Sequence, residues 1–189
     1  MGRKRFGGMS CGIARALEAY GDWWSLLIIR DAFFGARRFA DFQRSLGIST
    51  NILTNRLAHL VGHGILERAE AGIHGERHEY RLTAKGRDLL PVLTAMRDWS
   101  DRWVFGRGKE PLIVRDRRTG KRLPRLRILD AGGRAVALRD LRSEPGPGAS
   151  EELRRLFERA RRARRRRIPV TGSAASHRPS ATGTQRSRG

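Results

Sequence analysis

The sequence predicts a mainly α-helical domain with one small β-hairpin, followed by a basic C-terminal part. Apolar residues recur at helical spacing in several segments between residues 11 and 105. Two short strand-like segments flank a polar loop within residues 65–82, and arginine accumulates after residue 105. We therefore divide the chain into four parts: a basic arm 1–8, a domain 9–107, a small β-rich extension 108–145 and an Arg-rich tail 146–189.

The first two helices are predicted from their apolar spacing and from the residues at their ends. Residues 11–19 carry apolar side chains on one side, with Ser10 as a plausible N-terminal cap. Residues 23–34 are apolar around most of the helix, which is typical of a buried element, and Gly35 ends it.

The next two helices are short and separated by a tight turn. Residues 39–46 form the third predicted helix and Gly47 interrupts the chain. Residues 49–62 form the fourth, with Ser49 as its N-cap. One face of this fourth helix is apolar, since it carries Leu53, Leu57, Leu60 and Val61.

The opposite face of the fourth helix is small, polar and uncharged, and consists of Thr50, Asn51, Thr54, Asn55 and Ala58. A face that only meets solvent would more often carry Glu, Lys and Gln, because Asn and Thr are weaker helix formers. Asn side chains can pair with adenine in bidentate fashion, and Thr can meet a thymine methyl group or a phosphate. The pattern therefore favours contact with the DNA major groove over a plain solvated face.

A hairpin and a long helix complete the domain. Residues 65–68 and 79–82 are predicted strands, and the polar loop 70–76 between them would protrude. Thr83 would cap a long helix that runs to about Phe105, and Pro91 within it predicts a kink.

Helices followed by a two-stranded wing, in this order, predict a winged helix-turn-helix domain with dimerisation helices. Asn51, Thr54 and Asn55 would read bases. The phosphate contacts would come from arginines before the third helix, on the fourth helix and on the wing, which are Arg37, Arg38, Arg56 and Arg77. Further residues of the predicted DNA surface are Ser49, Thr50, His59 and His78.

The domain resembles the HxlR family of bacterial regulators. The resemblance is carried in unbroken order by CGIARAL at 11–17, GDWWSLLIIR at 21–30, GARRF at 35–39, GIS at 47–49, LTNRL at 53–57, GILER at 64–68 and EYRLTAKG at 79–86, and continues through PVL at 91–93 and Trp99. It implies a winged-helix dimer related to MarR-type folds. It also implies that the first and last helices form the dimer interface, that each fourth helix enters a half-site, and that there is no enzymatic activity.

A set of apolar residues on the first and last predicted helices is assigned to that dimer interface: Ile13, Leu17, Leu89, Leu93, Met96, Trp99 and Trp103. The tryptophans could instead line an effector pocket, but an aromatic stripe at helical spacing usually packs against protein.

Cys11, the only cysteine, is a candidate redox residue. It lies at the start of the first predicted helix and close in sequence to Arg3, Lys4 and Arg5, and both features favour the reactive thiolate. The resemblance implies the same role, since such families include sensors of quinones, aldehydes and oxidants. The alternative is a small residue packed in the dimer seam.

Several classes of protein are disfavoured. One cysteine permits no internal disulfide, and no apolar run is long enough to span a bilayer. We find no catalytic set, and the histidine pairs 59/63 and 74/78 lack further ligands for a metal. We therefore expect a cytoplasmic, nucleoid-associated protein that is not an enzyme, has no cofactor and no metal, and does not bind membrane.

The C-terminal part is strongly basic. Residues 1–105 carry 16 basic and 11 acidic residues, whereas residues 106–189 carry 24 and 8, and the whole chain has a net charge of +21. Strands are predicted at 112–114 and 126–129, and the tail is predicted to be disordered, with 151–163 helical when bound to a partner. The arginine run 161–167 could attract DNA, RNA or anionic lipid, or could simply be solvated.

The sequence thus predicts a sequence-specific transcriptional regulator, acting as a repressor. As a homodimer it would bind double-stranded DNA at a pseudo-palindrome with half-sites about one helical turn apart. A small molecule or an electrophile is the expected effector. The alternative is a non-specific architectural protein whose basic tail binds DNA or RNA.

Overall fold

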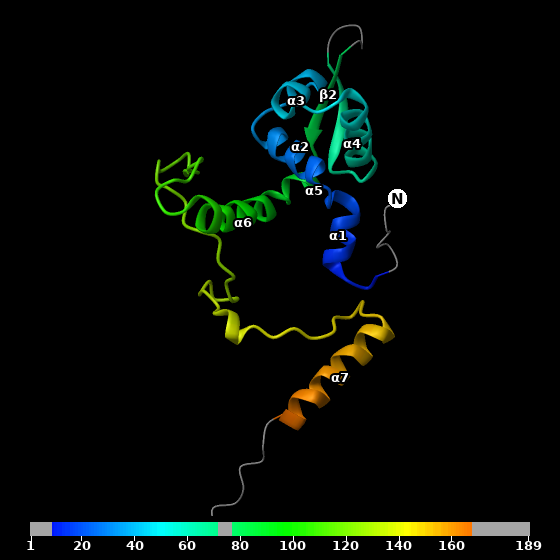
Figure 1. Ribbon diagram of the computed structural model, residues 1–189, viewed down its shortest axis with the longest axis vertical. Coiled ribbons are helices and arrows are strands. Elements are labelled where there is room, and N and C mark those ends of the chain that lie inside the picture. Colours follow the sequence, from blue (N-terminus) through cyan, green and yellow to red (C-terminus); the bar gives the residue numbers. More distant parts are fainter. Residues whose placement is uncertain (1–8, 72–76, 168–189) are drawn as a thin grey trace, which may run out of the picture. The chain divides into compact units, whose positions relative to one another are not determined.

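The computed structural model describes residues 9–71 and 77–167, with the backbone alone at residues 71, 77 and 164–167 (Figure 1). The chain divides into two units, Met1–Ser143 and Glu144–Gly189, and each is considered by itself. The basic arm 1–8, the tip of the wing at 72–76 and the end of the tail at 168–189 lie outside the described residues.

The first unit contains the predicted order of elements. Its helices are α1 (Gly12–Tyr20), α2 (Trp23–Phe33), α3 (Phe39–Leu46) and α4 (Thr50–Gly62), followed by strands β1 (Leu66–Ala71) and β2 (Arg77–Leu82). The chain continues through α5 (Ala84–Arg87), α6 (Leu90–Ser100) and a π-helical turn (Asp101–Phe105). A mainly helical domain with one small antiparallel sheet confirms the predicted winged helix-turn-helix fold.

Local chemistry sets the ends of these helices. The Asp22 carboxylate accepts a hydrogen bond from the Ser25 backbone N–H at 3.0 Å and so caps α2. Gly47, with a φ of 60°, ends α3 in the left-handed conformation that glycine adopts without a Cβ clash. The N-cap of α1 is Cys11, so the prediction of Ser10 at that position was one residue early.

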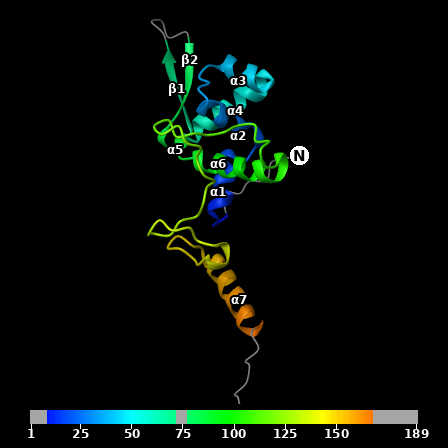
Figure 2. The ribbon, with the colours of Figure 1, turned by 90° about the vertical axis from the view of Figure 1, so that its left-hand side faces the viewer.

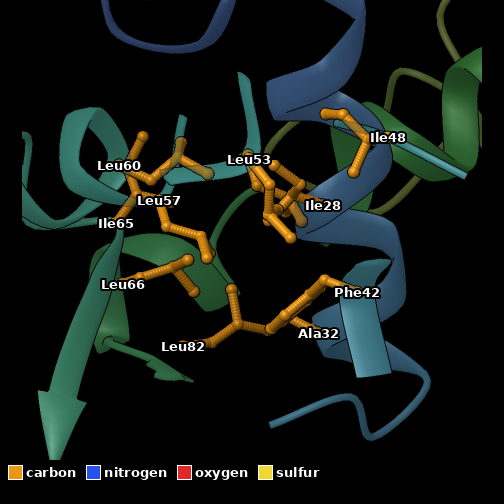
Figure 3. Close-up of a cluster of buried hydrophobic side chains, with 11 residues drawn as sticks. Ile28, Ala32, Phe42, Ile48, Leu53, Leu57, Leu60, Ile65, Leu66 and Leu82 are labelled. Carbon is orange, nitrogen blue, oxygen red and sulfur yellow. The ribbon is translucent and has the colours of Figure 1, made fainter. Parts of the chain in front are cut away.

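The core is a cluster of buried side chains that come from α2, α3, α4, the loops beside them and both strands (Figure 3). Its members are Ile28, Ile29, Ala32, Phe42, Ile48, Leu53, Leu57, Leu60, Ile65, Leu66 and Leu82. Because α4 contributes three leucines that have no solvent exposure, burial of this cluster holds one face of α4 in a fixed orientation.

The wing is a two-stranded antiparallel ribbon whose register runs from Leu66 opposite Leu82 to Ala71 opposite Arg77. Figure 2 shows the two strands side by side, next to α3 and α4. The Tyr80 N–H donates to the Arg37 carbonyl at 2.7 Å, and the Tyr80 ring meets Phe42 edge to face at 6.3 Å. The wing is therefore joined to the helix-turn-helix, and its strands are longer than the predicted 65–68 and 79–82.

The single long helix predicted from Thr83 to Phe105 is wrong, because the structure has α5, α6 and a π-helical turn in its place. Thr83 caps α5 by accepting from the Gly86 N–H at 3.1 Å, as its position predicts. Pro91 lies in the first turn of α6, where its missing N–H breaks no helical hydrogen bond. The proline therefore begins a helix and does not kink one.

The prediction of a β-rich extension is also corrected. Between residues 108 and 145 the structure has two isolated bridges, Arg115 with Arg122 and Leu129 with Ala135, and a short 3-10 turn (Leu138–Asp140). Two aspartates hold tight turns there: Asp116 accepts from the Arg118 N–H at 2.8 Å, and Asp130 accepts from the Arg134 N–H at 2.9 Å. Such local bonds stabilise turns in place of a continuous ladder.

The second unit contains α7 (Glu151–Arg167), where the sequence predicted a disordered tail with 151–163 helical only in a complex. Glu151 and Glu152 lie in its first turn, and Glu151 pairs with Arg155 one turn on at 3.2 Å. Acidic residues near a helix N-terminus and a segment rich in Arg, Ala and Leu both favour the helix. No helix within the described residues is long and apolar enough to cross a membrane.

Candidate nucleic-acid interface

The two faces of α4 differ completely in their environment. Leu53, Leu57 and Leu60 have 0% exposure and belong to the core cluster. On the other side, the exposed residues are Thr50, Asn51, Thr54, Asn55 and Ala58. The uncharged hydrogen-bonding face therefore lies in solvent while the leucine face is anchored in the core.

The N-terminus of α4 is held in position by two side chains. The Ser49 hydroxyl accepts from the Ile52 N–H at 3.4 Å, so Ser49 is the predicted N-cap. The Gln43 side-chain amide donates to the Thr50 hydroxyl at 3.1 Å, which links α3 to α4 across the turn. The sequence analysis did not assign Gln43 to the site. Gln43 lies in the last turn of α3, four residues before the C-cap Gly47, and this position next to the start of α4 could have identified it.

Arg56 forms an ion pair within its own domain, and its predicted contact with a phosphate stays a prediction. Its guanidinium Nε lies 3.2 Å from the Asp22 carboxylate, and the side chain is 29% exposed. Since Asp22 also caps α2, this ion pair joins the two helices.

Arg37 is half-buried and hydrogen-bonded within its own domain, and its predicted role at a phosphate stays a prediction. Its Nη1 donates to the carbonyls of Ala32 at 2.8 Å and Ala36 at 3.0 Å, which satisfies the end of α2. Arg38 remains exposed beside it. Hydrogen bonds from the backbone N–H groups of Arg38 and Arg37 hold the pKa of Asp41 below its ordinary value, so Asp41 is an ionised cap for α3.

His59, another residue of the predicted DNA surface, is half-buried, and its contact with DNA stays a prediction. Its ring lies against His63, with ring centroids 4.4 Å apart, and its Nε2 is buried with no hydrogen-bond partner. Burial lowers the pKa of His63, and the nearby His59 and Lys85 lower it further. Because the Lys85 ammonium donates to the His63 carbonyl at 2.7 Å, these residues close the C-terminal end of α4.

The wing carries charges of both signs. His78 is half-buried, and its Nδ1 has no hydrogen-bond partner among the described residues, while the side chain of Arg77 lies outside them. Arg68 is exposed on β1, and Arg81 on β2 pairs with Glu79 at 3.0 Å. Contacts of Arg77 and His78 with DNA stay predictions.

The residues predicted to form the dimer interface divide into two groups. Leu89 and Leu93 are partly buried and pack against the core of their own subunit, and their place in a dimer interface stays a prediction. The exposed group is Ile13, Leu17, Met96, Trp99 and Trp103. Trp99 and Trp103 are 62% and 64% exposed, so α1, α6 and the π-helical turn present large apolar side chains to solvent. Cys11 is exposed at the N-cap of α1.

Within the described residues, no three His, Cys, Asp or Glu side chains lie close enough together to hold a metal ion.

Comparison with known proteins identifies the domain. The family model described as HxlR-like helix-turn-helix matches residues 19–107. The uncharacterized HTH-type transcriptional regulator Rv3095 of Mycobacterium tuberculosis is 41% identical over 150 residues, which is 79% of this chain and 93% of that protein. A second uncharacterized HTH-type regulator, sll1512 of Synechocystis, is 39% identical over 98 residues, 51% of this chain and 73% of its own.

Two solved structures described as candidate transcription factors share the fold. PA1607 is 41% identical with a TM-score of 0.68, and the match covers 75% of this chain and 99% of that one. PA1374 of Pseudomonas aeruginosa is 42% identical with a TM-score of 0.56, covering 77% and 99%. The chain therefore belongs to the HxlR-like helix-turn-helix family of transcriptional regulators.

Proposed function

We propose that this regulator is a homodimeric repressor that reads a pseudo-palindromic operator with the exposed polar face of α4. One observation carries the proposal: Asn51, Thr54 and Asn55 are exposed on the side of α4 opposite three fully buried leucines. A rigidly held helix whose free side offers amides and hydroxyls, with no acidic residue on it, suits the base edges of the major groove. Repression would follow where the operator overlaps a promoter.

The surroundings of α4 support the same orientation. Arg38, ahead of α3, and Arg44, in its last turn, are both exposed. Arginines at these positions would meet phosphates on either side of the groove that receives α4. The Gln43–Thr50 hydrogen bond fixes α3 against the start of α4, so the phosphate and base contacts would be made as one unit.

Replacing Asn55 with alanine should weaken operator binding by about 1–3 kcal/mol, and only at one or two base positions. The reason is loss of a bidentate amide contact, which a single base pair supplies. The operator is first selected from a random-sequence duplex pool, and affinities are then measured for every single-base variant of it.

Ser143→Ala removes an exposed polar group outside the matched domain and should leave every affinity unchanged. Equal weakening of all DNA sequences by Asn55→Ala would show that Asn55 does not read bases.

The dimer is proposed from the apolar side chains left exposed on α1, α6 and the π-helical turn. Large apolar side chains gathered on exposed helix faces often mark protein–protein interfaces. A second copy would cover Ile13 and Leu17 of α1 together with Met96, Trp99 and Trp103, and would place two α4 helices on successive turns of one duplex face.

Trp99→Glu should raise the dimer dissociation constant about 30-fold or more, because a buried interfacial tryptophan contributes about 2 kcal/mol or more. Sedimentation velocity over a concentration series measures it. Trp23→Glu is the matched control, since Trp23 is 75% exposed at the start of α2. A Trp99→Glu protein that still dimerises like the parent would place the interface elsewhere.

A signal input at Cys11 is part of this proposal. The thiol is exposed at the first residue ahead of α1, the helix that carries Ile13 and Leu17. As the only cysteine, it can form a disulfide only with another molecule, including the second subunit. Modification of Cys11 would therefore act on the helix that we assign to the dimer.

A further inference from the structure

A large apolar hollow of the first unit lies apart from the predicted DNA surface. It is a cavity of about 810 Å³ between α2, α6 and the extension. Its walls include Leu27 of α2, Phe34 at the C-cap of α2, Met96 of α6 and Leu126 of the extension. This volume and this predominantly apolar lining are typical of sites that take a small organic ligand.

The polar part of the cavity is cationic. Four arginines line it, Arg30, Arg97, Arg125 and Arg127, and its described lining includes no acidic residue. Arg30 pairs with Asp31 at 2.7 Å and Arg97 with Asp98 at 2.9 Å, while Arg125 contributes to the field at Asp98. Arg127 has no ion-pair or hydrogen-bond partner in the part of the chain that the structure describes.

The wall formed by the extension is attached to α6. The Leu126 N–H donates to the Asp98 carboxylate at 2.8 Å. Burial raises the pKa of Asp98, but this hydrogen bond and the one from Arg97 outweigh burial, so the pKa lies below its ordinary value. An ionised Asp98 therefore holds Leu126, part of the cavity wall, next to α6 at neutral pH.

We propose that this cavity binds the anion of an apolar carboxylic acid, such as a fatty acid. The hydrocarbon chain would leave water for the leucine, phenylalanine and methionine walls. The carboxylate would pair with the uncommitted guanidinium of Arg127, which can donate two parallel hydrogen bonds. An uncharged alcohol of the same length would lose the charge-assisted bonds and retain the apolar contacts.

A helix of a second copy is the competing occupant. Of the residues that we assign to the dimer, Trp99 and Trp103 do not line the cavity and Met96 does, so the two surfaces overlap at that one residue. The two apolar surfaces share α6. Ligand in the cavity would therefore change the position of α6, the helix that we assign to the dimer and thus to the spacing of the two DNA-binding units. This regulatory consequence rests on the proposed function. Ligand binding itself does not.

Isothermal titration calorimetry of the full chain tests the site with decanoate, decan-1-ol and butyrate as probes. Decanoate should bind saturably, one per chain, and about tenfold or more tighter than decan-1-ol. Butyrate, which carries the charge without the chain, should give no measurable binding. Arg127→Gln should reduce decanoate affinity to that of decan-1-ol and leave decan-1-ol binding unchanged.

Matched variants separate this site from the rest of the basic chain. Arg117→Gln changes an exposed arginine of the extension that does not line the cavity, and should leave both affinities as they were. Leu126→Trp should fill the cavity and weaken both ligands about tenfold or more. Leu156→Trp, on exposed α7, should change neither.

Three results would overturn the proposal. Equal affinity for decanoate and decan-1-ol would show that the carboxylate is not recognised. Absence of saturable decanoate binding would show that the cavity does not take this class of ligand. Decanoate binding at several sites per chain, insensitive to Arg127→Gln and Leu126→Trp, would place the ligand on the arginine-rich tail. A protein that binds decanoate as described but selects no operator would contradict only the proposed function.

Discussion

Leu57→Ala is expected to lower the free energy of unfolding by about 2–5 kcal/mol. Leu57 has no solvent exposure and lies in the core cluster between α2, α4 and the strands. Truncation removes buried methyl groups and leaves a cavity that the surrounding side chains cannot fully close. Chemical denaturation followed by circular dichroism measures the loss, and operator binding should fall with it because α4 loses its anchor.

Thr54→Ala is the control on the other side of the same helix. Thr54 is exposed, so its truncation should change stability by about 0.5 kcal/mol or less while it still weakens DNA binding. Together, Leu57→Ala and Thr54→Ala separate the contribution of α4 to folding stability from its contribution to DNA binding. A Leu57→Ala protein as stable as the parent would mean that the leucine face of α4 is not buried, and the proposed exposure of Asn51 and Asn55 would fail with it.

Gly86→Ala is expected to cost about 3 kcal/mol of folding stability, at the upper end of the range for overpacking. A Cβ at residue 86 would lie 2.2 Å from the Ile65 carbonyl oxygen and 2.9 Å from a methyl carbon of Leu82. The Ile65 oxygen is backbone and accepts from the Thr83 N–H at 3.1 Å, so it cannot move without breaking the junction between the wing and α5.

The matched control is Gly62→Ala, in the last turn of α4. No atom lies within 4 Å of a Cβ at that position, so the substitution should stabilise the protein by up to about 1 kcal/mol through helix propensity. Thermal unfolding of both variants gives the comparison. Equal melting temperatures would contradict the close approach of α5 to the end of α4.

The sequence predicted the elements that depend on local patterns. The spacing of Leu53, Leu57 and Leu60 identified the buried side of α4, and Ser49 and Gly47 marked the ends of the turn before it. Such signals are readable because helix period and capping involve residues within one or two turns of each other. Pro91 was misread because the same proline is compatible with a kink or with a helix start.

The tertiary structure shows which side chains of the predicted surface already have partners within the domain. Arg56 could face DNA by its helical position, but its partner Asp22 lies 34 residues earlier. Arg37 turns to the carbonyls of Ala32 and Ala36, and His59 lies against His63. A periodic pattern assigns a face to each residue, and it contains no information on which charged group from another element meets that face.

The amino-acid sequence by itself determined the order of the helices, the wing and the polar side of α4, because these follow from apolar periodicity and from caps within a few residues. Only the tertiary structure showed which of the predicted dimer residues pack against the core and which are exposed. It alone also revealed the cavity lined by Arg127. Both arise where segments distant in the chain approach one another, as Leu126 approaches Asp98, and such contacts depend on packing in three dimensions.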